Sequence, residues 1–213
     1  MRRIVFPPVD TATEDGLVAI GGDMEVDTLV EAYRQGIFPW PLSPEFPLAW
    51  FSPDPRGVLD FSELHVPRSL EKFRRHHPYR IAMNEGFESV IRLCAAVPRR
   101  DQIQTWITPE IIRGYTQLFQ QNLAWCASAW LGSRLVGGVY GVKLAGFRSG
   151  ESMFTLEDNA GKLCLLEAIR TFQGDGVAWL DVQMVTPVVE GLGGRYVSRR
   201  EFLERLGPAL STP

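Results

Sequence analysis

The feature that most constrains the fold is a β-rich run at residues 135–154 that turns back on itself. Residues 135–144 mix β-branched and aromatic residues with glycines, and residues 147–154 follow after a short Ala-Gly turn. Two such segments around a tight turn predict a β-hairpin. The returning strand carries Glu151 between a glycine and an apolar Met-Phe pair. Because an unpaired buried charge is costly, Glu151 is either solvated at a strand edge or held by partners in a site.

Helical and strand patterns surround this hairpin and predict an α+β architecture. Strands are expected at residues 124–131 and 177–184 from their short apolar runs. Amphipathic segments that follow good N-cap residues predict helices. These caps are Asp27, Asn84, Thr108, Asn159 (or Asp158) and Ser198.

Residues 1–60 are rich in proline, glycine and aromatic residues, which predicts a small, loop-rich N-terminal domain before a main domain at residues 61–213. Aromatic residues are dense at 37–40 and at 48–51. They form either a satellite core or a wall on which a nucleic-acid base stacks. Composition alone favours the core.

The formal net charge of -3 excludes a global basic field, so any nucleic-acid contact needs a local patch. One basic cluster is present, in which Arg68, Lys72 and Arg75 recur at helical spacing and His76 follows. Such a stripe is either a solvated helix face or a phosphate-binding surface.

A pair of polar residues interrupts the apolar strand predicted at residues 177–184. Side chains alternate along a strand, so Asp181 and Gln183 are expected on one face, where they can hydrogen-bond to each other. The sequence therefore predicts a site on this strand.

Cysteine usage and hydropathy limit the setting of the protein. Cys94, Cys126 and Cys164 are widely spaced, which fits a reducing compartment and no metal motif. No apolar run approaches the length of a membrane span. We expect a monomeric, soluble protein of the cytoplasm, without membrane or metal.

Seven short motifs decide between these possibilities. In chain order they are DGLVAIGGD (15–23), AYRQGIFPW (32–40), WFSPDPR (50–56), TWIT (105–108), VGGVYG (136–141), GESMF (150–154) and DVQ (181–183). Each motif is weak alone. Together, over about residues 5–206, they closely resemble the bacterial leucyl/phenylalanyl-tRNA–protein transferases.

The resemblance implies a small N-terminal domain packed on a GNAT-like (N-acetyltransferase-like) domain, with a mixed sheet flanked by helices. It implies transfer of Leu, Phe or Met from aminoacyl-tRNA to an N-terminal Arg or Lys of acceptor proteins, which marks them for degradation. The implied partners are aminoacyl-tRNA and these acceptors, and no cofactor is implied.

The resemblance also assigns roles to residues. Asp181 and Gln183 match a catalytic relay, and Glu151 matches the other acidic residue of the site. Four aromatic positions match those near the terminal adenosine of the tRNA, and the basic stripe matches a helix for its acceptor stem. The aromatic positions are Tyr33, Trp40, Trp106 and Tyr115, and the stripe is Arg68, Lys72, Arg75 and His76.

The implied amino-acid pocket is where this chain departs from the family. Its lining is Val139, Arg148, Leu165, Ala168, Phe172 and Leu180. Ala168 replaces a larger aromatic residue and Arg148 replaces a Phe, while Trp125 and Cys126 replace a His-Ser pair. With the Arg148 head turned outward, a wider apolar cleft would accept Phe as well as Leu and Met.

Two other functions remain open from the residues. An acyl-CoA-dependent N-acetyltransferase would need a glycine-rich loop for pyrophosphate at a helix N-terminus. The loop at residues 155–161 has one glycine and two acids, which argues against it. The other alternative is an inactive tRNA-binding or protein-binding relative, against which Glu151, Asp181 and Gln183 argue.

Overall fold

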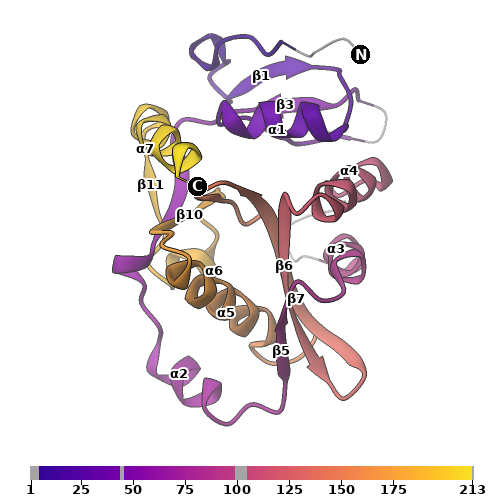
Figure 1. Cartoon of the computed structure of the whole chain (residues 1–213), viewed down its shortest axis with the longest axis vertical. Helices are drawn as coiled ribbons and strands as arrows, with labels where there is room; N and C mark the ends of the chain where they lie inside the picture. Colours follow the sequence, from indigo (N-terminus) through magenta and orange to yellow (C-terminus); the bar gives the residue numbers. More distant parts are fainter. Residues whose placement is uncertain (1–4, 44–45, 99–104, 213) are drawn as a thin grey trace.

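The computed structural model describes residues 5–43, 46–98 and 105–212, and its N-terminal part is a small antiparallel sheet with one helix (Figure 1). The strands are in the order β1-β3-β2, and α1 packs on α4 and α7 of the larger part. The elements are η1 (Val9–Thr11), β1 (Leu17–Ile20), α1 (Val26–Arg34), β2 (Phe38–Pro39) and β3 (Ala49–Phe51).

A five-stranded antiparallel sheet forms the centre of the larger part, with α3 and α4 on one face and α5 on the other (Figure 1). Alternation along β6 explains these layers, because Ala124 and Cys126 pack toward α3 and α4 while Trp125 and Ala127 pack toward α5. The elements are β5 (Arg80–Met83), α3 (Phe87–Ala96), α4 (Pro109–Gln120), β6 (Ala124–Leu131), β7 (Arg134–Leu144), β8 (Phe147–Arg148), β9 (Ser152–Thr155) and α5 (Ala160–Gly174).

A third sheet, in the order β10-β4-β11, joins the central one through a single parallel bridge between Ser149 and Asp181. That bridge makes the whole assembly a mixed sheet flanked by helices, so the predicted α+β class is confirmed. The remaining elements are β4 (Arg56–Asp60), η2 (Phe61–Glu63), α2 (Arg68–Arg74), β10 (Trp179–Gln183), α6 (Pro187–Glu190), β11 (Arg195–Val197) and α7 (Arg199–Ser211).

Strand β4 bears on the domain boundary expected at residue 60. Both of its partners, β10 and β11, belong to the C-terminal part of the chain. We therefore propose a boundary before residue 56, so that β4 belongs to the main domain.

The predicted helices are found, but two of the predicted caps are wrong. Thr108 and Ser198 accept hydrogen bonds from backbone N–H groups in the first turns of α4 and α7, as expected. Helix α1 begins at Val26, so Asp27 lies inside its first turn. Asn84 instead accepts from the Cys126 N–H at 3.2 Å and ties the start of α3 to β6. Asn159 stands before α5 without a side-chain cap bond.

The predicted hairpin is confirmed, with an interruption that sequence patterns did not indicate. Between the register pairs Lys143–Arg148 and Tyr140–Ser152, two residues of β7 face three residues, 149–151, of the returning chain. The extra residue makes a β-bulge. Glu151 therefore lies in the bulge, with its N–H donating to the Tyr140 carbonyl at 2.9 Å, and not in a regular strand.

Gly141 makes this bulge possible, because a Cβ there would overlap the Ser149 carbonyl oxygen. We expect Gly141→Ala to lower the free energy of unfolding by about 3 kcal/mol, since the backbone of the bulge must move. Chemical denaturation measures this change. Gly207→Ala is the control, because nothing lies within 4 Å of its added methyl, and Ala is favoured in a helix by about 1 kcal/mol. Equal stability of Gly141→Ala and the wild type would contradict the account.

Candidate active site

The Glu151 carboxylate lies where the bulge, α4 and β10 meet. Ser149 donates a hydrogen bond to Oε1 at 2.5 Å, and the Gln183 side-chain amide donates to the same oxygen at 3.1 Å. Tyr115 donates to Oε2 at 3.4 Å. Glu151 itself is half-buried. The structure thus resolves the alternative left open by the sequence: Glu151 is held by partners and is not a solvated edge residue.

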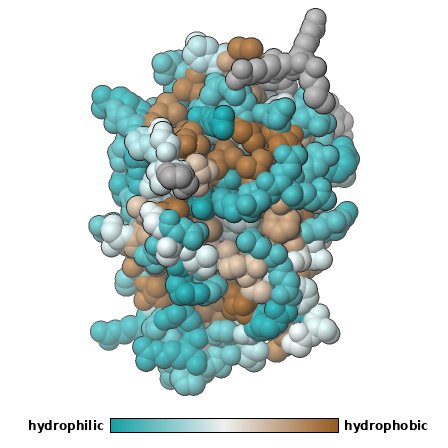
Figure 2. All heavy atoms as spheres, in the orientation of Figure 1, coloured by the Kyte–Doolittle hydropathy of each residue, from teal (hydrophilic) through white to brown (hydrophobic). Residues whose placement is uncertain are grey.

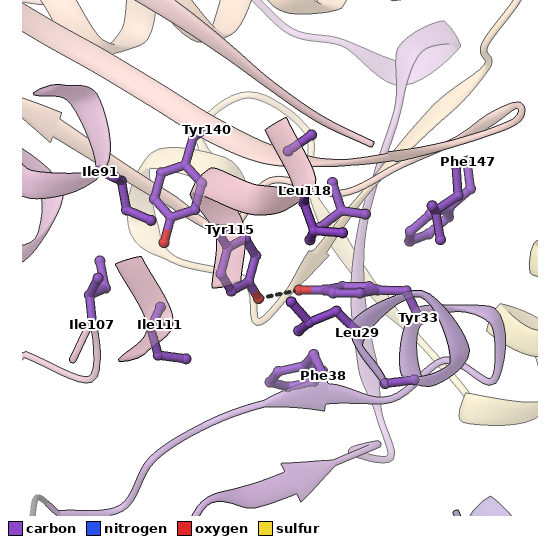
Figure 3. Close-up of a cluster of buried hydrophobic side chains, with 14 of the residues drawn as sticks. Leu29, Tyr33, Phe38, Ile91, Ile107, Ile111, Tyr115, Leu118, Tyr140 and Phe147 are labelled. Carbon is purple, nitrogen blue, oxygen red and sulfur yellow. Dashed lines mark hydrogen bonds between the residues drawn. The ribbon is translucent and has the colours of Figure 1, made fainter. Parts of the chain in front are cut away.

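Tyr33 of α1 and Tyr115 of α4 support this carboxylate from inside the core. Their hydroxyl oxygens are 2.5 Å apart and point toward one another among apolar side chains (Figure 3). Burial, followed by the nearby charge of Glu151, raises the pKa of both phenols well above the usual range. Both hydroxyls therefore stay protonated as hydrogen-bond donors at neutral pH.

This placement corrects the expectation that Tyr33 and Tyr115 line the adenosine. Only 1% of Tyr33 and 0% of Tyr115 is exposed, so neither ring offers a face to a base in this structure. Trp106, with 6% exposed, is buried as well, and only Trp40 of the four is partly exposed. Trp40 is half-buried and stacks on Trp106, with ring centroids 5.2 Å apart and planes at 14°. Their neighbours in the chain, residues 41, 105 and 107, help to line a depression of about 580 Å³.

Burial is also the main influence on Glu151, and it raises the pKa of the carboxyl to about 7. Hydrogen bonds from Ser149 and Tyr33 lower the pKa, while the charge of Asp181 raises it. A carboxyl with this pKa exchanges a proton near neutral pH, as an acid–base group requires.

Asp181 and Gln183 come together as predicted, but through a different bond. A register shift separates them in β10, and Gln183 has a positive φ of 55°. The expected bond between the two side chains is replaced by one from the Gln183 backbone N–H to Asp181 Oδ1, at 3.0 Å. The Gln183 amide group is directed instead at Glu151.

Arg56, which the sequence reasoning missed as a site residue, pairs with Asp181 on both oxygens. Its Nε donates to Oδ1 at 2.9 Å and its Nη2 donates to Oδ2 at 2.7 Å. The two residues are 125 positions apart in the chain, so no local spacing could have indicated the pair. The only sequence signal was that Arg56 ends one of the seven motifs.

Most of the predicted pocket residues belong to one buried cluster, which the inner face of α5 forms with strands β7 and β10. Trp125 belongs to it as well, packing edge-on against Phe172 at 4.8 Å and donating from its indole N–H to the Ser149 carbonyl at 2.9 Å. This tryptophan therefore connects the cluster to the bulge that carries Glu151. The predicted members in the cluster are Val139, Leu165, Ala168, Phe172 and Leu180.

Arg148 does not turn outward as expected. Only 6% of it is exposed, and its guanidinium carbon lies 5.4 Å from the centre of the Phe172 ring. Nη1 donates to the Phe147 carbonyl at 2.9 Å, and Nη2 is 3.7 Å from the Asp175 carboxylate. Backbone carbonyls and Asp175 thus hold the head inside, because a buried guanidinium needs such partners.

The basic stripe is an exposed face of α2 and the turn after it, at the end of the molecule opposite β1 (Figure 1). Glu71 interrupts it by pairing with Arg74 at 2.9 Å and with Arg75 at 3.3 Å. Figure 2 shows hydrophilic side chains over this end of the molecule, whereas hydrophobic atoms reach the surface mainly in the upper half.

Comparison with known proteins shows which family the chain belongs to. Residues 58–207 match the family described as leucyl/phenylalanyl-tRNA protein transferase, and residues 22–54 match its N-terminal domain. A leucyl/phenylalanyl-tRNA–protein transferase of Anaeromyxobacter sp. (strain K) is 43% identical over 212 residues, which are 100% of this chain and 91% of the relative. That of Laribacter hongkongensis is 44% identical over 98% of this chain and 89% of the relative. The chain belongs to this family.

Solved structures with some likeness include an aminoglycoside acetyltransferase from an uncultured soil metagenomic sample. It is 13% identical, with a TM-score of 0.37, over 63% of this chain and 88% of that one. L-PGS from Bacillus licheniformis is 10% identical, with a TM-score of 0.41, over 86% of this chain and 62% of that one. At such scores these likenesses carry no argument, and the leucyl/phenylalanyl-tRNA–protein transferase family rests on sequence.

Two further observations concern the described residues of this transferase-family chain. None of their helices is long and apolar enough to cross a bilayer. No three of their His, Cys, Asp and Glu residues are grouped so as to hold a metal ion.

The raised pKa of Glu151 predicts a pH-dependent stability. The folded chain retains a proton that the unfolded chain releases between the ordinary value of 4.5 and about 7, so the free energy of unfolding falls as pH rises through this range. Glu151→Gln has no carboxyl at this position, so its free energy of unfolding does not fall in this way. Its stability relative to the wild type should therefore be higher at about pH 8 than at about pH 5, as measured by thermal unfolding. The same difference at both pH values would contradict the assignment.

Proposed function

We propose that the protein transfers Leu or Phe, and also Met, from aminoacyl-tRNA to an N-terminal Arg or Lys of acceptor proteins, marking them for degradation. We further propose that it acts as a monomer in the cytoplasm. Membership of the family supports the reaction class. The observation that carries the proposal is the network in which Ser149, Gln183 and Tyr115 hold the Glu151 carboxylate.

The reaction forms an amide bond and breaks an ester bond. The α-amine of the acceptor attacks the carbonyl carbon of the aminoacyl ester, and the terminal ribose oxygen leaves. An α-amine has a pKa of about 8, so it needs only modest help to attack at neutral pH. Its surplus proton passes to Glu151, whose pKa of about 7 suits that role, and finally to the ribose oxygen. A hydroxyl and an amide are then the products.

Gln183 orients the attacking amine. Its Nε2 group is committed to Glu151, so its carbonyl oxygen is the free end of the amide. A carbonyl oxygen accepts a hydrogen bond from an amine N–H and directs the nitrogen lone pair. Gln183 and Glu151 thus contact the amine, while Asp181, whose oxygens accept from Arg56 and from the Gln183 N–H, does not.

The donor tRNA is held by stacking and by charge. Stacking of a base on an aromatic ring is worth roughly 1–3 kcal/mol, and the half-buried Trp40 beside Trp106 is the best placed for the terminal adenosine. The exposed cations of α2 bind phosphates of the acceptor stem. Such contacts read the RNA without its sequence. Because these contacts do not distinguish one tRNA from another, selection of the amino acid falls to the buried cluster around Phe172.

The N-acetyltransferase alternative lacks support at the helix that would hold pyrophosphate. A Cβ at Gly161 in the first turn of α5 would overlap the Thr155 hydroxyl, so this turn packs directly on the end of β9. Glu157 and Asp158 precede it and would repel an anion. No specific observation favours this function.

A transfer assay tests the proposed function. The protein is incubated with labelled amino acids on a mixed tRNA pool and with acceptors that begin with Arg, Lys or Ala. We expect label from Leu and Phe on the Arg and Lys acceptors only, and about 100-fold less with Glu151→Gln. Transfer of an acidic amino acid would overturn the donor assignment. No transfer, with normal tRNA binding, would identify an inactive relative.

Charge changes on α2 should alter tRNA affinity for all tRNAs alike. Lys72→Ala should weaken binding and reduce the salt dependence by about one unit of slope, because one phosphate contact is lost. Glu71→Ala should strengthen binding, since it releases Arg74 and Arg75 from ion pairs. Filter binding across salt concentrations measures both. Arg200→Ala on α7, which is 87% exposed, is the control. Wild-type binding by all variants would make α2 a solvated face only.

A further inference from the structure

Arg56 of β4 contacts residues of four other parts of the fold. Besides its two bonds to Asp181 of β10, its Nη1 donates to the Gly36 carbonyl after α1 at 3.0 Å. Its guanidinium carbon lies 4.7 Å from the ring centre of Phe38 in β2 and 4.4 Å from that of Phe202 in α7. Only 1% of Arg56 is exposed. These contacts together fix the orientation of the guanidinium group.

Asp181 is enclosed by its partners and is not accessible to a substrate. Its Oδ1 accepts from Arg56 Nε and from the Gln183 N–H, and its Oδ2 accepts from Arg56 Nη2. The residue is 0% exposed. A buried ion pair contributes little net stability, because desolvation offsets most of its attraction. What this pair supplies is a rigid anion at one position.

That anion determines the conformation of Gln183. A positive φ is unfavourable for a residue other than glycine, by about 1 kcal/mol or more. Gln183 adopts a φ of 55°, and the bond from its N–H to Asp181 holds it there. The same turn breaks the strand register and directs the side-chain amide to Glu151. A second backbone bond, from the Met184 N–H to the Val182 carbonyl at 2.5 Å, closes the same turn, so the anion adds to a local preference and fixes its direction.

We propose that Arg56 is a positioning residue for the transfer reaction, which acts through Asp181 to fix the backbone of Gln183 and so aims its amide between Glu151 and the attacking amine. Asp181 is then an anchor that exchanges no proton with substrate. The inference rests on the proposed function for its kinetic consequences, but its geometry is independent of the reaction.

Kinetics of Arg56→Lys test the inference, with Arg205→Lys as the matched control. Arg205 also joins α7 to the sheet, through Asp60 and over the Trp179 ring at 4.7 Å, but does not contact Asp181. Lysine keeps the charge of Arg56 but loses the two-pronged bond. We expect kcat to fall about 10- to 100-fold with an unchanged KM for aminoacyl-tRNA. Arg205→Lys should lose thermal stability without loss of kcat.

The pH profile provides a readout that a purely structural role would not move. Tyr33, Tyr115, Asp181 and Arg56 face Glu151 from α1, α4, β10 and β4. Burial is the main cause of the raised pKa of Glu151. The charge of Asp181 raises this pKa further, and the charge of Arg56 lowers it. Arg56→Gln should therefore shift the acidic limb of kcat/KM to higher pH, and Asp181→Asn should shift it to lower pH. If Arg56→Gln does not fold, Asp181→Asn, which is nearly isosteric, still tests the anchor.

The outcomes separate the two claims. If the wild type transfers and Arg56→Lys matches it in kcat and in pH profile, Arg56 is not a positioning residue, although the proposed function stands. If the wild type does not transfer, the proposed function fails, and NMR of the Gln183 side-chain amide decides the inference. Its resonances should shift in Arg56→Lys and stay in place in Arg205→Lys. Unmoved resonances in both variants would overturn the inference.

Discussion

The buried ion pair of Arg56 and Asp181 is the interaction on which the rest of the site depends. It lies where the N-terminal part, through the Gly36 carbonyl, meets β4 and β10 of the larger part. Phe38 and Phe202 enclose it between their rings. Since an isolated charge cannot stay in such surroundings, Arg56 and Asp181 must remain paired, and the remaining Arg56 donor binds the Gly36 carbonyl of the N-terminal part.

A second constraint places Glu151 opposite this pair. The bulge at residues 149–151 interrupts the regular pairing with β7. There the Gly150 N–H donates to the Asp181 carbonyl at 2.8 Å. The bulge and β10 are thereby joined directly. Glu151 then meets Gln183 on one side and Tyr115 on the other. Burial in this network raises its pKa to about 7, which suits the proton-acceptor role that we propose for it.

Local pattern predicted the longer helices and the strands at residues 124–131, 135–154 and 177–184, but it missed the short strands β1 to β5 and β11 and failed where distant parts of the chain meet. The strand at residues 124–131 and the helix after Thr108 follow from alternation and capping, which are properties of neighbours in sequence. Alternation also indicated Asp181 and Gln183 as a pair, and the hairpin drew attention to Glu151, whereas the resemblance supplied the roles of these three residues. The Tyr33–Tyr115 bond joins residues 82 positions apart, and the Gln183 N–H bonds to an Asp181 carboxylate that Arg56 holds from 125 positions away. Neither leaves a local signal.

In the mechanism that we propose, this network makes Glu151 the proton acceptor of the site. Isotope-edited infrared titration tests it most directly, by comparing ¹³C-glutamate-labelled wild type with Glu151→Gln to isolate the one carboxyl. We expect a carboxylate band that increases with pH and has its midpoint near pH 7. A midpoint in the ordinary glutamate range, about 4.3, would contradict it.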